Sequence, residues 1–293
     1  MTELNYRFTY DTLFKMLFVQ TPEVLKSLVA AILQIAPEHI AEFKITNPEI
    51  PPESLGDKFC RLDINMIVDG QRINLEVQVA DEGDYAERSL YHWAREYSSA
   101  LKAGSSYAEL PRVIIISLLD FSLFTCKEYH SEYYPLEVTR HERLSDKMTM
   151  HYFELQKLPK DIDVKNQLEL LLSLFRAKTE EDLRWLEELE VPVVTEAIGA
   201  YREITISPEF RELERLRADA RHNEASALQH AAKQAAKVER EKWQVVVSNK
   251  EVEFAETLAE TVAEKEATLA EKEATLAEKE AEIARLRALL GDA

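Results

Sequence analysis

The chain has 293 residues, of which 46% are hydrophobic, and a formal net charge of −18. This length and composition allow a substantial core, in one large domain or in a domain with an appendage. Two cysteines, Cys60 and Cys126, are too few for a disulfide framework or a four-thiolate zinc site. The acidity argues against broad attraction to phosphate backbones, because non-specific affinity for nucleic acid comes largely from Lys and Arg.

The distribution of charged and apolar residues along the chain indicates where the acidity lies and whether a segment could span a membrane. Residues 251–293 hold twelve acidic and five basic residues, so part of the acidity is local to the C-terminal segment. No segment approaches the roughly 20 apolar residues that span a bilayer, and the first residues lack a basic stretch followed by an apolar run. We therefore expect a cytoplasmic protein that does not enter a membrane.

Two helices are predicted first along the chain. Thr21 and Pro22 are typical of a helix start, with Thr21 as the cap and Pro22 at the first helical position. The apolar residues that follow predict a helix to about Ile35. Before it, a shorter apolar stripe predicts another helix, with Asp11 and Lys15 one turn apart on a different side.

A β-hairpin is the clearest local prediction. Residues 59–68 and 71–79 alternate polar and apolar side chains around Asp69-Gly70, a strong two-residue turn signal. This turn places Asp63 directly opposite Glu76 and gives the hairpin one apolar and one polar face. The apolar face contains Leu62, Ile64, Met66, Ile73, Leu75 and Val77. The polar face contains Arg61, Asp63, Asn65, Arg72, Asn74, Glu76 and Gln78.

Strands and helices then alternate before a purely helical region. We expect a helix over residues 84–103 that ends at Gly104, a strand over 112–119 that is buried on both faces, and another strand over 151–155. Residues 163–203 are typical of helices, and Pro208 opens a long helix toward Trp243. This order predicts an α/β fold, with domains over residues 1–160, 161–247 and 248–293.

The C-terminal segment is a heptad repeat. The unit Ala-Thr-Leu-Ala-Glu-Lys-Glu recurs with period seven and keeps one apolar series in register, namely Val262, Leu269, Leu276 and Ile283. Each heptad has only one large apolar residue, so a coiled-coil seam would be thin. We favour pairing with another helix, as in a homodimer; a solvated single helix or a low-complexity tail without a partner is the alternative.

The opposed acids Asp63 and Glu76 carry the chemistry. Two carboxylates facing each other across a hairpin repel unless a positive charge lies between them. A divalent cation such as Mg²⁺ or Mn²⁺ meets this need, because it prefers oxygen ligands and completes its coordination with water and phosphate oxygens. Gln78, on the same face, is a candidate to orient a water or bind phosphate. The alternative is that this polar face simply meets solvent.

Several ordered motifs resemble the recombination-promoting nuclease/putative transposase family. They are Asp11–Phe18, Leu62-Asp63-Ile64, Glu76-Val77-Gln78, Arg88, Tyr91, Tyr97, Gly104–Tyr107 and Leu118–Phe121. The resemblance covers roughly residues 5–155, and a helical extension is usual in that family. It implies a restriction-endonuclease-like PD-(D/E)XK fold, a mixed sheet flanked by helices, and Mg²⁺-dependent cleavage of DNA.

Residue roles follow from the resemblance. Asp63 and Glu76 correspond to the metal ligands, and Gln78 stands where the wider superfamily has a lysine, so the site lacks that positive charge. Lys15, Arg88 and Arg95 are candidates for phosphate contacts, or else surface charges that aid solubility. Asp11 is either a third acid near the metal or a helix cap. Tyr91 and Tyr97 could stack on bases, but we expect them to be core residues.

Three functions are compatible with these features. The first is a metal-dependent DNA endonuclease, linked through its family to recombination, mobile elements or phage defence, and dimeric through its tail. The second is a catalytically weak or inactive nuclease fold that acts as an interaction or regulatory module. The third, a transposase with a ribonuclease-H-like site, is weaker, because that chemistry needs a differently spaced acidic triad.

Overall fold

A computed structural model describes residues 2–47, 63–101 and 104–291. In this part of the chain one six-stranded sheet has the order β1-β2-β3-β4-β6-β5. The central strands β3, β4 and β6 are parallel to one another, and the outer pairings are antiparallel. The predicted mixed α/β sheet is therefore confirmed. The strands are β1 (Phe43–Ile45), β2 (Ile64–Val68), β3 (Gln71–Gln78), β4 (Val113–Leu119), β5 (His130–Tyr133) and β6 (Met148–Glu154).

The predicted hairpin is formed by β2 and β3. Ile64 pairs with Leu75 and Val68 with Gln71, which is the predicted register. Asp69 and Gly70 both have positive φ, as a tight two-residue turn requires. Asp63 directly precedes β2, so the same register brings it opposite Glu76. The predicted positions of Arg61 and Leu62 lie outside the described residues.

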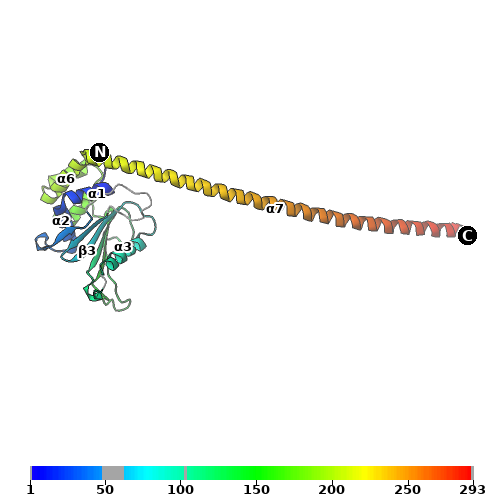
Figure 1. Cartoon of the computed structure of the whole chain (residues 1–293), viewed down its shortest axis with the longest axis horizontal. Coiled ribbons are helices and arrows are strands. Elements are labelled where there is room, and N and C mark those ends of the chain that lie inside the picture. Colours follow the sequence, from blue (N-terminus) through cyan, green and yellow to red (C-terminus); the bar gives the residue numbers. More distant parts are fainter. Residues whose placement is uncertain (1, 48–62, 102–103, 292–293) are drawn as a thin grey trace. The chain divides into compact units, whose positions relative to one another are not determined.

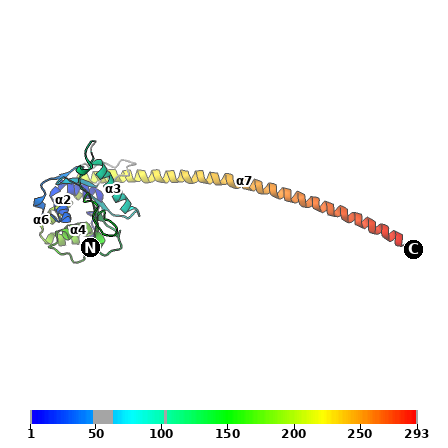
Figure 2. The same ribbon diagram turned by 90° about the horizontal axis from the view of Figure 1, so that it is seen from below.

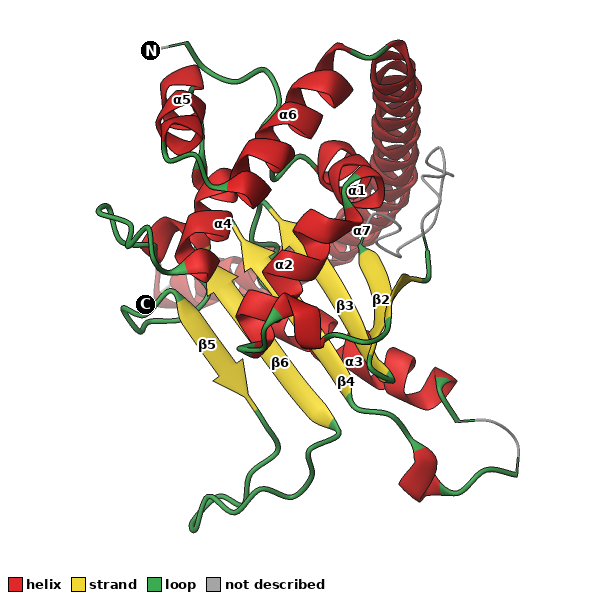
Figure 3. Ribbon diagram, turned by 90° about the vertical axis from the view of Figure 1, so that its left-hand side faces the viewer, coloured by secondary structure: helices red, strands yellow, loops and turns green. Residues whose placement is uncertain are grey.

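Helices cover both faces of the sheet (Figure 3). Those that pack with the apolar hairpin face in the main core are α1 (Asp11–Gln20), α2 (Pro22–Leu33), α4 (Gln167–Arg176), α5 (Glu180–Glu188) and α6 (Pro192–Ile206). On the opposite face α3 (Tyr85–Ser99) packs in a smaller core with Val113, Ile115 and Tyr152. Strand β4 is buried along its whole length, because both layers lie against it. Short 3-10 helices span Pro37–His39, Tyr107–Glu109 and Leu155–Lys157.

Some boundaries differ from those that the sequence predicted. Strands β1 and β5 were not predicted, because they are short and only partly buried and so have no long apolar run. Strand β6 begins at Met148, three residues before the expected start, and α3 ends at Ser99. The long C-terminal helix α7 spans Pro208–Gly291 and does not end near Trp243.

The chain divides into two compact units, Met1–Arg221 and His222–Ala293. Helix α7 begins in the first unit, where Phe210 is buried and its ring packs against Tyr6. In the second unit the apolar heptad residues are exposed. Figure 1 shows α7 in yellow to red, and Figure 2 shows it from a second direction. Within the described ranges no single helix is long and apolar enough to cross a membrane; only α1 and α2 taken together, with a bend of 101° between them, meet that test.

Candidate active site

Helix α3 covers the polar face of the hairpin and makes it a buried site. Only 4% of Asp63, 3% of Asn74 and 1% of Glu76 remain exposed to solvent. The alternative that this face simply meets solvent is therefore wrong. A buried carboxylate is unfavourable unless hydrogen bonds or a cation compensate its charge, so this arrangement needs a physical reason.

Asp63 is held by side chains from α1, from β3 and from the segment after β1. The Asn74 amide donates to its Oδ2, and the same amide donates to Asn65 Oδ1 at 2.8 Å. The main-chain carbonyl of Asp63 accepts from Lys15 Nζ at 2.9 Å and from Asn47 Nδ2 at 3.0 Å. Burial raises the pKa of Asp63 to about 6, and repulsion from Glu76 adds to this, while the Asn74 hydrogen bond opposes it. The position is fixed, but the charge is poorly compensated.

Glu76 lies in the middle of the same face. The Tyr85 hydroxyl donates to Glu76 Oε1, and His92 Nδ1 lies 3.8 Å from Oε2. Burial raises the pKa of Glu76, and the Tyr85 hydrogen bond and the charge of Arg88 partly oppose this shift. Neither Glu76 Oε2 nor His92 Nδ1 has a hydrogen-bond partner within the described part of the chain. Glu76 Oε2 and His92 Nδ1 are therefore buried near each other, and each lacks a hydrogen bond from the described residues.

Sequence reasoning missed the roles of Tyr85 and His92. Tyr85, Arg88, His92 and Arg95 are spaced three, four and three residues apart, so they share one face of α3. This spacing is visible in the sequence, and it is the signal that could have found Tyr85 and His92. Burial lowers the pKa of His92, and the charge of Arg95 lowers it further. The α3 face thus brings the Tyr85 hydroxyl, the His92 ring and the charge of Arg88 to Glu76, while the charge of Arg95 acts on His92.

Two of the sequence candidates lie elsewhere than expected. Lys15 is fully buried and bonds the Asp63 carbonyl, so a phosphate outside the fold is beyond its reach, and it positions Asp63 instead. Asp11 begins α1 and pairs with Arg217 Nη2 at 2.6 Å, and its other oxygen accepts from the Thr12 amide. Asp11 is not the helix cap, because Tyr10 holds that position. It is also not placed as a third acid near the metal, because its carboxylate pairs with Arg217.

The remaining candidates lie on α3 and at the end of β3. Gln78 Oε1 accepts from Arg88 Nη2 at 2.6 Å, so the two predicted residues are in direct contact. Arg95 is half-buried and close enough to affect His92. Tyr97 packs in the smaller core as predicted, but the prediction was wrong for Tyr91, which is 55% exposed because it faces away from the sheet.

A comparison with protein families matches residues 8–232 to the family described as PD-(D/E)XK nuclease family transposase. The chain belongs to this family. The resemblance recognised from the motifs is confirmed, and the match extends beyond the sheet into the first part of α7. Comparisons with curated proteins and with solved structures gave no match. Membership of the PD-(D/E)XK nuclease family supports a nuclease-like activity for this chain.

Divalent metals are the usual cofactors of PD-(D/E)XK nucleases, and the donor set here fits one. Asp63 and Glu76 supply carboxylate oxygens, the ligand type that Mg²⁺ and Mn²⁺ prefer. Glu76 Oε2 lacks a partner among the described residues, and a cation would offset the burial that raises both pKa values. No cluster of three or more His, Cys, Asp or Glu suited to a metal occurs in the described ranges. Among the described residues the fit is to two carboxylates, and water and substrate oxygens would supply further ligands.

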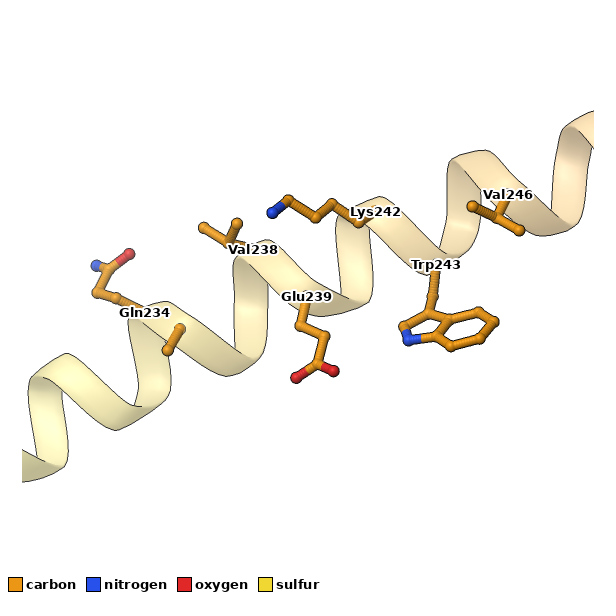
Figure 4. A pocket seen from close by; sticks show the side chains of 7 residues that line it. Gln234, Val238, Glu239, Lys242, Trp243 and Val246 are labelled. Atoms are coloured by element: carbon orange, nitrogen blue, oxygen red, sulfur yellow. The ribbon is translucent and has the colours of Figure 1, made fainter.

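A hollow on α7 differs in kind from the site around Asp63 and Glu76. It is lined by Gln234, Ala235, Val238, Glu239, Lys242, Trp243 and Val246, which all belong to one helix. Figure 4 shows these side chains projecting from successive turns of that helix. A surface with a single wall does not enclose a small ligand, so the polar face beneath α3 is the stronger candidate for catalysis.

Proposed function

We propose that this protein is a metal-dependent endonuclease that hydrolyses phosphodiester bonds in DNA. The observation that carries the proposal is the pair of buried, opposed carboxylates, Asp63 and Glu76, whose pKa values are raised by burial although the charges of Lys15 and Arg88 partly oppose that rise. These protein cations do not cancel the cost of burying the two carboxylates, so the pair is suited to an additional, exchangeable cation.

Each residue of the site has its own role in the proposed reaction. Asp63 and Glu76 hold the metal, which when bound polarises the phosphate and activates water. Asn74 and Tyr85 each bond one carboxylate oxygen and so fix the direction of the remaining ones, as outer partners of metal ligands do. Lys15 and Asn47 anchor the Asp63 main chain. Gln78 and Arg88 are only half-buried, so substrate approaches from their side.

DNA binding by so acidic a chain requires local positive charge. Arg88 and Arg95 supply it on the face of α3 that covers the site, and we propose that both contact phosphates. Because only Arg88 and Arg95 contact phosphates, DNA binding depends on geometry more than on net charge. The affinity for DNA should therefore fall less with rising salt concentration than is usual for a DNA-binding protein.

The C-terminal heptads provide a route to a dimer. Val262, Leu269, Leu276 and Ile283 are exposed in the single chain, so pairing with the same segment of a second copy would bury them. Cleavage of both DNA strands needs two active sites, and a dimer supplies them. Roles in recombination, mobile elements or phage defence belong to this proposal through the family alone.

The direct test is cleavage of supercoiled plasmid by the purified full chain with Mg²⁺ or Mn²⁺. Nicked and linear products should form and should disappear with EDTA and in the Asp63→Ala variant. Activity that persists in Asp63→Ala would assign the cleavage to another site or to a contaminant. Absence of cleavage by the wild type across salt and metal conditions would refute the endonuclease assignment.

The exposed heptad residues favour one other function, a protein-interaction module on a weak or inactive nuclease fold. In that case the tail binds a partner and the acid pair has no metal. Measurement of metal binding by the full chain separates the two functions, because only the nuclease needs a cation at Asp63 and Glu76.

A further inference from the structure

The amide of Gln78 has a fixed orientation. Its Nε2 donates to the Ala80 carbonyl at 3.2 Å, and its Oε1 accepts from Arg88 Nη2 at 2.6 Å. Because the carbonyl of Ala80 accepts only, the amide nitrogen must face it and the amide oxygen must face Arg88. Both ends of this side chain are therefore engaged, and the two bonds fix its amide between the Ala80 carbonyl and Arg88.

The guanidinium of Arg88 is held at the edge of the metal-binding face. It follows Tyr85 by three residues on α3, and its Cζ lies 4.9 Å from the centre of the Tyr85 ring. The Tyr85 hydroxyl binds Glu76, so the Tyr85 side chain contacts the acid through its hydroxyl and the guanidinium through its ring face. The charge of Arg88 is near enough to oppose the rise in the pKa of Glu76.

Arg88 also has capacity to spare for a ligand. Its side chain is 26% exposed, and its ion pair with the exposed Glu82 is long, at 3.5 Å. Its Nε is buried and has no hydrogen-bond partner within the described ranges. A buried, unpaired donor is costly, so this guanidinium is incompletely bonded within the fold. The terminal nitrogens have more N–H groups than the bonds to Gln78 and Glu82 use, and these are suited to phosphate oxygens.

We propose that Arg88 is the catalytic cation of this site and that Gln78 is the residue that positions it. The positive charge that the superfamily places on the strand, at the position of Gln78, is here supplied from helix α3. This inference rests on the proposed nuclease function and assigns within it the group that contacts the reacting phosphate.

The chemistry limits what Arg88 does. In hydrolysis a water oxygen bonds to phosphorus, the bond from phosphorus to one sugar oxygen breaks, the water loses a proton and the leaving oxygen gains one. A guanidinium keeps its protons at neutral pH, so Arg88 takes part in neither transfer. It donates N–H bonds to the non-bridging oxygens, where negative charge grows in the transition state.

The test compares single variants with a charge swap in the full-length protein. Arg88→Gln should lower kcat by about 10²–10³-fold, the usual effect of losing one group that stabilises developing charge. Arg88→Lys should keep more activity than Arg88→Gln. Gln78→Ala should lower kcat by about tenfold, as loss of a supporting partner does. The double variant Gln78→Lys/Arg88→Gln should recover part of the activity lost in Arg88→Gln.

Two controls separate this inference from other roles of Arg88. Arg140, an exposed arginine paired with Glu137 and Glu142, is the matched control, and Arg140→Gln should cleave like the wild type. Metal affinity, measured by calorimetry without DNA, should stay close to the wild-type value in Arg88→Gln. DNA affinity measured with Ca²⁺ in place of Mg²⁺ should fall much less than kcat.

Three results would overturn the inference. One is a rise in KM for Arg88→Gln with an unchanged kcat, which would make Arg88 a phosphate anchor only. Another is a charge swap that recovers nothing although the double variant keeps the wild-type circular dichroism and metal affinity. The third is equal activity of Arg88→Lys and Arg88→Gln. Failure of the nuclease function itself has a different signature, since the wild type and Arg140→Gln would then also lack metal-dependent cleavage.

Discussion

One face of the β2–β3 hairpin packs apolar side chains in the main core with α1, α2, α4, α5 and α6, whereas the other packs polar side chains beneath α3. The residues alternate along the same two strands, so Leu75 and Glu76 are neighbours in sequence and equally buried. Burial of Leu75 stabilises the fold, because apolar surface leaves water. Burial of Glu76 opposes folding, because a carboxylate loses its hydration.

The comparison teaches that burial alone does not identify a core. The apolar face needs nothing beyond its packing, while the polar face has unpaired atoms, raised carboxyl pKa values and cations at its edge. A face that costs stability is retained for what it binds. The two faces should therefore respond oppositely to substitution.

The largest effect is expected on activity at the polar face. Glu76→Gln removes a metal ligand but keeps the shape of the side chain, so plasmid cleavage should fall by more than about 100-fold. The urea-unfolding midpoint should not fall. A variant that cleaves normally would exclude Glu76 from the metal site.

The apolar face should show the reverse. Leu75 is fully buried, so Leu75→Ala should destabilise the protein by about 2–5 kcal/mol in urea unfolding through lost burial and the cavity left behind. Val138→Ala is the control, since Val138 is 89% exposed and its truncation should change stability little. A Leu75→Ala variant as stable as Val138→Ala would show that this face is not the main core.

The pH dependence of stability should sharpen the difference between the faces. Burial raises the pKa of Asp63 to about 6, above its value of 3.8 in an unfolded chain. Above pH 6 the folded protein therefore bears the unfavourable buried charge, and below pH 4 that charge is gone. Without metal, Asp63→Asn should be more stable than the wild type at pH 8, by up to about 3 kcal/mol.

The wild type and Asp63→Asn can also contradict this prediction when their stabilities are compared across pH. The stability difference between Asp63→Asn and the wild type should shrink as the pH falls from 7 to 4, and urea unfolding at each pH measures it. A difference that is constant across this range, or a wild type that is more stable at pH 8, would mean that the Asp63 carboxylate is well compensated.

The smallest effect is expected for Tyr85, which contacts the proposed metal ligand Glu76 and not the metal itself. Tyr85→Phe removes the hydroxyl that bonds Glu76 but keeps the ring that packs beside Arg88 and Tyr152. Metal affinity should fall by about tenfold, as it does when an outer partner of a ligand is lost. Calorimetric titration with Mn²⁺ measures this change, and an unchanged affinity would make the Tyr85 hydroxyl dispensable.

Much of this comparison could be predicted from the sequence because it depends on local patterns. The turn at Asp69-Gly70 sets the register, and the register alone places Asp63 opposite Glu76 and separates the two faces. Pro22 and the apolar stripe after it likewise predict α2. These are interactions between residues close in the chain, which periodicity and turn chemistry describe well.

The missed features depend on packing between distant residues. Nothing in the polar alternation of β3 says that α3 will cover it, so the burial of the acids could not be predicted. Lys15 resembled a surface charge until α1 was placed against Asp63. The contact of Gln78 with Arg88 joins a strand to a helix across a loop, and pattern analysis does not predict such contacts.

The most direct test of the central claim is calorimetric titration of the metal-free full chain with Mn²⁺ at pH 7.5, alongside Asp63→Asn and Glu76→Gln. We predict a metal site in the wild type that needs both carboxylates and is lost or strongly weakened in each variant. Unchanged binding in both variants, or no binding by the wild type, would contradict the assignment of Asp63 and Glu76 as the metal ligands.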